Sequence, residues 1–263
     1  MSKKIKIVSG WSNPGGSTTA HISLSNLLNE NGLDCTFYGP HEWHRDKCKS
    51  GHISECSLKE DDILISHFIQ PPTVKVKKHI LSCHETNLFP LKQIPLQSYD
   101  VIHFVSQYQK DWHGVDHPSV VIPGIIDDIS WSNPNNGTAG VVGSIDEHKQ
   151  THLSVQRAFD DGYNKVLLFG QINDKPYFDS EIEPLLRTGK VTIKNYCQDK
   201  EEMYGSVEAV YHSSKRECLP MVQGECLKAG IPFFGMERNM RGLEDYLFDN
   251  QQILNKWKAI LES

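Results

Sequence analysis

Short apolar runs alternate with helical segments along almost the whole chain, and this alternation limits the possible folds more than any other feature. The beginning of the chain predicts a strand over residues 4–9, a glycine-rich turn over residues 10–16 and a helix over residues 17–31. Another apolar run at residues 35–38 predicts the next strand. A strand–helix–strand unit of this kind is typical of a parallel sheet.

The same alternation continues to the end of the chain and is interrupted once. Further strands are predicted at residues 63–66, 78–83, 101–105, 120–122, 140–143, 165–170, 191–193, 209–212 and 231–234, and further helices at residues 151–161, 176–187, 199–207, 221–229 and 243–261. Residues 131–137 consist almost wholly of turn-forming residues and predict a linker. Two successive α/β units joined by a polar linker indicate two Rossmann-like domains.

Two chemical details refine the predicted helix that begins near residue 17. The hydroxyl groups of Ser17, Thr18 and Thr19 can cap the free N–H groups at its start. Gly32 can adopt the left-handed conformation that ends a helix.

Composition excludes several classes of protein. The 263 residues are 38% hydrophobic and carry a formal net charge of −6, which argues against a broad basic face for nucleic acid and against an anionic membrane surface. No apolar run approaches the roughly 18 residues of a membrane span, and the run at residues 5–8 is too short for a signal peptide. Seven scattered cysteines favour reduced thiols, so we expect a cytoplasmic protein without a transmembrane segment.

The most informative stretch is residues 213–232. Glu217 follows a predicted strand in a loop closed by Pro220, and Glu225 lies two turns further on, inside the following predicted helix. Two glutamates at this spacing would by themselves indicate only a solvated helix face. Their placement, one after a strand and the other inside the next helix, makes a solvated face less favoured.

This stretch resembles the retaining, nucleotide-sugar-dependent glycosyltransferases of the GT-B fold, the group 1 or family 4-like enzymes with the E-x7-E motif. The matching residues are Ser214, Glu217, Pro220, Glu225, Ala229, Gly230 and Pro232. Cys226 stands where alanine is usual. The resemblance implies an α/β protein with two Rossmann-like domains facing a cleft, in a chain shorter than is common for the family. It also implies an acceptor-side domain at residues 1–125, a linker at 126–138, a donor-side domain at 139–238, and a C-terminal helix within 239–263 that crosses back onto the first domain.

A nucleotide sugar carries groups that such residues can bind. A carboxylate accepts two hydrogen bonds from a vicinal diol, and charge-assisted hydrogen bonds are the strong ones. The resemblance implies that Glu225 binds the ribose and that Glu217 lies at the donor sugar as a catalytic residue. The N–H groups of Met221 and Val222 at the helix start are the candidates for the diphosphate, because Pro220 has no N–H.

A second stretch, residues 142–149, matches the family segment that opens the donor domain. Lys149 stands at the position of the lysine that binds the diphosphate. Ser144 replaces the usual arginine, which removes one of two cations that stabilise the leaving phosphate. Lys215 or Arg216 would have to compensate, or catalysis would be weak.

Four further residues are candidates on the same resemblance. Gly15 and Gly16 stand where the family places a loop near the donor phosphates, although neither a dinucleotide-binding fingerprint nor a P-loop is present. His84 follows a strand, where a family histidine approaches the donor sugar. The alternative for His84 is a hydrogen-bonded loop histidine. Tyr196 follows another strand and is a candidate for contact with the base.

One cluster lies outside this account. Its members recur every three or four residues and are His41, His44, Cys48, His52 and Cys56. Imidazole and thiolate groups can hold zinc, but no C-x-x-C is present and Gly51 interrupts a single helix. The alternative is an exposed loop that faces the acceptor. His67 and His103 lie on apolar strands and are predicted to be core or cleft residues with satisfied hydrogen bonds.

The predicted function is transfer of a hexose from a nucleotide diphosphate sugar, a UDP- or GDP-sugar, to an acceptor hydroxyl with retention at the anomeric carbon. The resemblance implies no metal and no cofactor besides this co-substrate. The acceptor remains open among a saccharide, a lipid-linked saccharide, a protein and a small molecule. Two alternatives remain: a catalytically weak or inactive nucleotide-sugar-binding protein, which Ser144 favours, and a sugar-nucleotide epimerase of the same fold.

Overall fold

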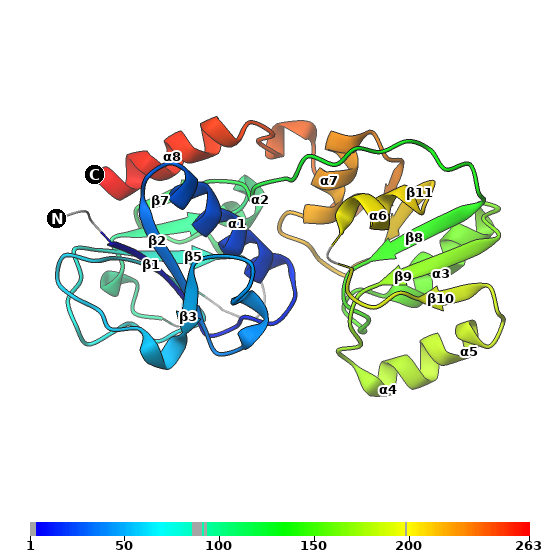
Figure 1. Cartoon of the computed structure of the whole chain (residues 1–263), viewed down its shortest axis with the longest axis horizontal. Coiled ribbons are helices and arrows are strands. Elements are labelled where there is room, and N and C mark those ends of the chain that lie inside the picture. Colours follow the sequence, from blue (N-terminus) through cyan, green and yellow to red (C-terminus); the bar gives the residue numbers. More distant parts are fainter. Residues whose placement is uncertain (1–3, 86–90, 92–93, 198) are drawn as a thin grey trace. The chain divides into compact units, whose positions relative to one another are not determined.

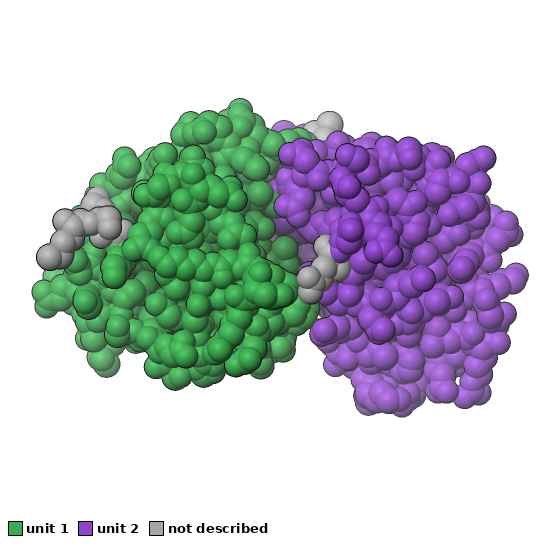
Figure 2. Space-filling view, in the orientation of Figure 1, with its two compact units in different colours: residues 1–125, 245–263 green, residues 126–244 purple. Residues whose placement is uncertain are grey.

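The computed structural model describes residues 4–85, 91, 94–197 and 199–263, and it consists of parallel sheets with flanking helices (Figure 1). The chain divides into two compact units (Figure 2). Unit 1 comprises Met1–Ile125 together with Asp245–Ser263, and unit 2 comprises Ile126–Glu244. The C-terminal segment therefore belongs to the same unit as the N-terminal half of the chain.

Unit 1 is built on a parallel sheet of seven strands in the order β3-β2-β1-β4-β5-β6-β7. The strands are β1 (Lys4–Ser9), β2 (Asp34–Gly39), β3 (Ser50–His52), β4 (Ile63–His67), β5 (Lys78–Cys83), β6 (Val101–Phe104) and β7 (Ser119–Val121), and the helices are α1 (Gly16–Glu30), α2 (Gln107–His113) and α8 (Asn250–Glu262). The chain runs outward from β1 to β3 and then returns to β4 beside β1. The strand order thus reverses between β1 and β4, and such a switch point is where open α/β sheets bind ligands.

The core of unit 1 explains why its central strands read as continuous apolar runs. All five residues of β4 are buried, as expected for a parallel strand covered on both faces. Leu24 and Leu28 of α1 pack into the same core as Ile253 and Trp257 of α8. The apolar face of α8 therefore completes the core of unit 1 (Figure 1).

Unit 2 is built on a parallel sheet of five strands in the order β10-β9-β8-β11-β12. The strands are β8 (Thr138–Val142), β9 (Lys165–Phe169), β10 (Val191–Ile193), β11 (Ala209–His212) and β12 (Phe233–Gly235), and the helices are α3 (Thr151–Asp160), α4 (Lys175–Tyr177), α5 (Glu183–Leu186), α6 (Lys200–Gly205) and α7 (Met221–Ala229). Here the order reverses between β8 and β11. Buried residues such as Val155, Val166 and Tyr211 form the core.

The predicted helix at 176–187 is divided into three parts. A π-helical turn, Phe178–Ile182, separates α4 from α5. Pro184 explains the change, because a proline has no N–H for the carbonyl four residues earlier. The remaining short turns are the 3₁₀ helices at Glu42–His44, Ile53–Glu55, Leu96–Ser98, Glu237–Asn239 and Leu243–Asp245.

Several predicted limits were wrong for identifiable reasons. Helix α1 is capped by Gly15 without any side-chain hydrogen bond, because Thr18 is buried instead of capping the helix. Helix α8 begins at Asn250, after the Asp249 carboxylate accepts a hydrogen bond from the N–H of Gln251 at 2.8 Å, and not near residue 243. Two short elements were missed, β3 and α2, the latter capped by Ser106.

In the described part of the chain, no helix has the length and apolar character needed to cross a membrane. All seven cysteines are free thiols.

Candidate functional site

The switch point of unit 2 brings two predicted site residues together. Lys149 lies in the segment after β8, and Glu217 lies in the segment after β11, so both extend from strands that flank the reversal. The Lys149 Nζ donates a hydrogen bond to Glu217 Oε1 at 2.5 Å. Residues 68 positions apart in the sequence thus form an ion pair at the sheet edge where ligands bind.

A third residue, His212, completes this pair. It is the last residue of β11, and its Nε2 lies 2.9 Å from Glu217 Oε1. Because a carboxylate only accepts hydrogen bonds, the His212 Nε2 carries the hydrogen. Burial by itself raises the pKa of Glu217, but the Lys149 ammonium and the His212 hydrogen bond hold that pKa well below its usual range. Glu217 is therefore a fixed carboxylate near neutral pH and cannot serve there as a proton donor.

The segment before α3 positions Lys149. The Asp146 carboxylate accepts a hydrogen bond from the Lys149 N–H at 2.8 Å, and its other oxygen accepts one from the Ser144 hydroxyl at 2.5 Å. Gln150 then adopts a left-handed conformation, with φ of 50°, at the N-cap of α3. This conformation is rare for a residue other than glycine and often marks a functional segment.

One basic residue expected to compensate for Ser144 lies on the surface, and another basic residue lies beside Glu217. Lys215 pairs with Glu147 on the exposed surface. Arg241, which the sequence did not suggest, donates hydrogen bonds to the backbone oxygen of Glu217 at 2.8 Å and to that of Cys218 at 3.3 Å. The guanidinium of Arg241 therefore adds a positive charge directly behind the loop that carries Glu217.

Glu225 is buried inside α7 and is held by two neighbours. Its Oε1 accepts a hydrogen bond from Lys200 Nζ at 2.5 Å, and its Oε2 accepts one from the Tyr204 hydroxyl. Lys200 also binds Asp127 at 2.6 Å. Burial lowers the pKa of Lys200, but the Glu225 and Asp127 carboxylates outweigh that effect and raise it, so Lys200 stays charged. A carboxylate offers about four acceptor positions, so two remain on Glu225.

The start of α7 offers backbone donors beside this pair. The first helical bond in α7 joins the Gly224 N–H to the Pro220 oxygen at 3.2 Å. The N–H groups of Met221 and Val222 precede that bond, and both residues are partly exposed. A helix N-terminus with such donors suits an anion. Tyr196, the candidate for the base, is partly exposed between β10 and α6.

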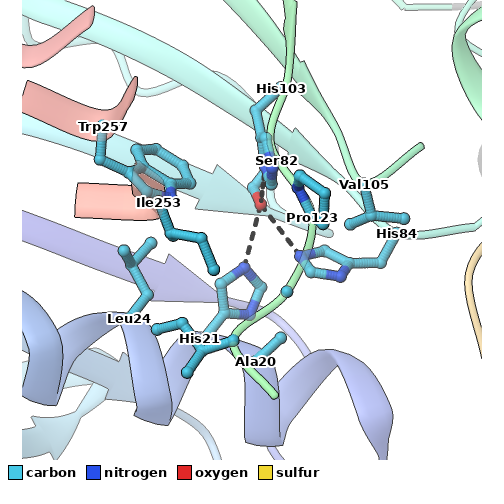
Figure 3. Close-up of a pocket in the computed structure, with 12 residues that line it drawn as sticks. Ala20, His21, Leu24, Ser82, His84, His103, Val105, Pro123, Ile253 and Trp257 are labelled. Atoms are coloured by element: carbon cyan, nitrogen blue, oxygen red, sulfur yellow. Dashed lines mark hydrogen bonds between the residues drawn. The ribbon is translucent and has the colours of Figure 1, made fainter. Parts of the chain in front are cut away.

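The remaining candidates lie in unit 1. Gly15 and Gly16 form the start of α1, and a Cβ added at Gly16 would meet no atom within 4 Å. His84 follows β5, and its Nε2 lies 3.1 Å from the Ser82 hydroxyl. Burial, together with neighbouring imidazoles, lowers the pKa of His84 well below its usual value. His84 is therefore neutral at pH 7. It lines a pocket together with His21 (Figure 3).

The five members of the His/Cys cluster are not gathered around one point. Among the described residues, no three His, Cys, Asp or Glu side chains are grouped as a metal site requires. The His44 ring is buried against Phe37, and its Nε2 lies 3.2 Å from the Gly51 oxygen. His52 caps a short 3₁₀ turn through its side chain.

His67 and His103 are buried and hydrogen-bonded through both ring nitrogens, which confirms their prediction as core or cleft residues. Other residues that contact these candidates were not predicted from the sequence. His212 could have been predicted, because it ends a predicted strand at the carboxyl edge. Lys200 and His21 could not, because only the folded chain brings them to their partners.

No family model matches the chain, and no curated protein matches it either. Solved structures match it over nearly its full length. The structure of HepE from Anabaena in complex with UDP and glucose has 12% sequence identity and a TM-score of 0.69, covering 99% of this chain and 90% of HepE. HepE has also been solved with UDP-glucose.

Two glycosyltransferases give similar matches. AviGT4, involved in avilamycin A biosynthesis, has 15% identity and a TM-score of 0.64 over 97% of this chain and 88% of its own. WaaG, involved in lipopolysaccharide biosynthesis, has 10% identity and a TM-score of 0.63 over 98% of this chain and 90% of its own. The predicted fold class is thereby confirmed: the chain has the α/β fold with two parallel sheets that is seen in GT-B glycosyltransferases.

Proposed function

We propose that the chain is a glycosyltransferase that moves a hexose from a nucleoside diphosphate sugar to an acceptor hydroxyl with retention at the anomeric carbon and without a metal. The observation that carries this proposal is the Lys149–Glu217 ion pair at the switch point of unit 2. The shared GT-B fold supports it. The complexes of HepE with UDP and UDP-glucose favour a UDP-sugar over a GDP-sugar as donor.

The diphosphate would bind at the start of α7. The N–H groups of Met221 and Val222 and the ammonium of Lys149 would face its oxygens, so that protein cations and dipoles neutralise the leaving group. Lys149 would then divide its hydrogen bonds between Glu217 and the phosphate, since an ammonium has three N–H donors. Because these protein groups would neutralise the leaving diphosphate, the proposed reaction requires no metal.

Glu225 would accept hydrogen bonds from the ribose diol. Lys200 and Tyr204 hold the carboxylate in place and leave two acceptor positions, which are sufficient for two hydroxyl groups. Tyr196 would contact the base. Because Glu225 is already held by the protein, the ribose would meet a fixed carboxylate and little ordering would be required on binding.

Glu217 would bind donor-sugar hydroxyls and stabilise positive charge that develops at the anomeric carbon. The bond from that carbon to the leaving phosphate oxygen breaks, and a bond from it to the acceptor oxygen forms on the same face. The proton of the acceptor passes to the leaving phosphate oxygen, and the products are a glycoside and a nucleoside diphosphate. A permanently ionised Glu217 fits this role better than that of a general acid.

The test is a panel of nucleotide sugars, first for binding by calorimetry and then for transfer to candidate acceptors and for hydrolysis. Lys149→Met should weaken donor binding, whereas Lys215→Met, an exposed lysine paired with Glu147, should not. The anomeric configuration of the product tests retention, and activity in excess chelator tests metal independence. A new sugar nucleotide formed without an acceptor would indicate an epimerase and overturn the proposal.

A second candidate, a nucleotide-sugar-binding protein without turnover, is favoured by one observation. Ser144 replaces a family arginine, and its hydroxyl is engaged with the Asp146 carboxylate. A negative group therefore lies where the resemblance places a cation. Donor binding without transfer or hydrolysis of any nucleotide sugar in the panel would favour this candidate.

A further inference from the structure

A small pocket in unit 1 is lined by three imidazoles and by apolar side chains (Figure 3). The three imidazoles belong to His21 of α1, to His84 after β5 and to His103 of β6. All three converge on the hydroxyl of Ser82, with nitrogen–oxygen distances of 3.1, 3.1 and 3.0 Å.

The hydrogen bonds of His103 fix the position of its proton. Its Nε2 lies 2.8 Å from the Ile122 backbone oxygen, which only accepts, so the Nε2 carries a hydrogen. Burial lowers the pKa of His103 to about 4, although the bond to Ile122 opposes this, and the ring is neutral at pH 7. The Nδ1 of His103 is consequently bare, and the Ser82 hydroxyl donates its hydrogen to it.

The single hydroxyl hydrogen of Ser82 determines which nitrogen carries the hydrogen in the other two rings. Because that hydrogen goes to His103, the Ser82 oxygen must accept from the Nε2–H groups of both His21 and His84. Burial lowers the pKa of both histidines well below its usual value, so each is neutral and each Nδ1 is a bare acceptor. The Nδ1 of His21 is buried and has no hydrogen-bond partner in the part of the chain that the structure describes.

The neighbouring His67 has a different hydrogen-bond pattern. The Ser9 hydroxyl donates to the Trp11 oxygen, so the His67 Nδ1, 2.8 Å from Ser9 Oγ, must donate to it. The His67 Nε2 lies 3.2 Å from the Glu85 carboxylate. The ring centroid of His67 is 5.0 Å from that of His21, and the electrostatic effect of His67 further lowers the pKa of His21.

We propose that this pocket binds one neutral sugar hydroxyl, which donates its hydrogen to the Nδ1 of His21. A hydroxyl would satisfy a buried acceptor that is otherwise destabilising without a partner. The apolar side chains of Leu24, Ile253 and Trp257 would contact the carbon that carries the hydroxyl. A carboxylate or phosphate would be rejected, since its lone pairs would face the lone pair of the nitrogen. The inference rests on the proposed function only in assigning the hydroxyl to a sugar.

The direct test uses the full chain labelled with [¹⁵N]histidine and long-range ¹H–¹⁵N NMR at pH 7.5. We expect Nε2–H tautomers for His21, His84 and His103. Molar ethylene glycol, a small neutral diol, should shift the His21 Nδ1 resonance in the direction of an accepted hydrogen bond. Sodium acetate should not do so when the ionic strength is matched.

His44 provides an internal control. It is also buried in unit 1, and its Nδ1 has no hydrogen-bond partner among the described residues, but it does not line the pocket. Its resonance should stay in place. An Nδ1–H tautomer at His21, no response to ethylene glycol, an equal response to acetate, or a matching response at His44 would each overturn the inference.

UDP-glucose and methyl glucoside then identify the source of the hydroxyl. A shift with UDP-glucose assigns the pocket to the donor, and a shift with methyl glucoside alone assigns it to the acceptor. If UDP-glucose binds by calorimetry but neither sugar shifts His21, the sugar assignment is wrong while the proposed function stands. If ethylene glycol shifts His21 but no nucleotide sugar binds, the proposed function fails and the hydroxyl site remains.

Discussion

Both units place polar side chains at the carboxyl edge of a parallel sheet, but the groups at the two edges differ in charge. Unit 2 has two largely buried carboxylates, each held by a lysine: Glu217 by Lys149 and Glu225 by Lys200. Unit 1 surrounds the Ser82 hydroxyl with imidazoles that burial keeps neutral. The same architecture thus gives one edge suited to a charged ligand and another suited to neutral hydroxyl groups.

This difference between the two edges follows from the partners that a buried charged group and a buried neutral group require. A buried carboxylate is stable only with a cation and hydrogen bonds, so unit 2 requires its lysines. A neutral imidazole requires only hydrogen-bond partners, and a serine hydroxyl can serve several at once. The two edges should therefore respond differently to substitution and to pH.

The largest effect is expected at Glu217. The variant Glu217→Gln keeps the shape of the side chain but removes the charge that would stabilise the anomeric carbon, so kcat for the best donor should fall about 1000-fold. Steady-state kinetics measure this. Glu147→Gln, an exposed glutamate in the same unit, is the matched control and should keep full activity. Equal rates for both variants would remove Glu217 from the reaction.

The second prediction concerns stability. Lys149→Met leaves the largely buried Glu217 carboxylate with His212 as its one side-chain partner among the described residues, and the free energy of unfolding should fall by about 3 kcal/mol in urea denaturation. Lys215→Met breaks an exposed pair and should change that free energy by less than about 1 kcal/mol. Similar losses in the two variants would mean that the Lys149–Glu217 pair is not buried as described.

The third prediction separates the units by pH. His103 has a folded pKa of about 4 against a usual 6.5, so the unfolded chain binds its proton first as the pH falls. The contribution of neutral His103 to the free energy of unfolding is complete above pH 6.5 and is lost toward pH 4, a change of about 3 kcal/mol. Glu217 has a lowered pKa, so its contribution is present above pH 4.5 and is lost only below it. Unfolding free energies measured between pH 7 and pH 3 should therefore decline in two stages. Glu217→Gln should reduce the second stage, below pH 4.5, and leave the first stage unchanged. A constant value from pH 7 to pH 4.5 would contradict the neutral state of the histidines.

The smallest effect is expected at Ser144. The variant Ser144→Arg introduces the cation that the resemblance leads one to expect, beside the Asp146 carboxylate. Calorimetry should then show donor binding tighter by about fivefold, which corresponds to about 1 kcal/mol. Unchanged or weaker binding would mean that Arg241 already supplies the second charge or that the diphosphate binds elsewhere.

The fold could be predicted from the sequence wherever local signals were complete. The limits of β5, β10, β11 and α7 agree with prediction. For α7 the signals are explicit, because Pro220 precedes the helix and Gly230 ends it. The predicted hydroxyl cap of α1 was wrong, because Thr18 is buried and Gly15 caps the helix without a side chain. Residues 243–249 were included in the last helix because their apolar spacing continues before Asp249 begins α8.

The candidate sites could be predicted only in part. Glu217, Glu225 and Lys149 were found because they lie in recognisable segments after strands, and their roles toward a donor remain predictions. Lys200 was missed because its partner Glu225 is 25 residues away. His21 was missed because nothing in the sequence of α1 shows that its ring meets Ser82 across 61 residues. Partners of this kind depend on sheet order, which the sequence alone did not determine.

The most direct test of the central claim is calorimetric titration of UDP into the wild-type chain and into the Lys149→Met and Lys215→Met variants. We predict that UDP binds the wild type and Lys215→Met equally and that Lys149→Met binds it about 10–100-fold more weakly, as expected for loss of one charge-assisted contact. Equal binding by all three proteins, or no binding by the wild type, would contradict a nucleotide site at the switch point of unit 2.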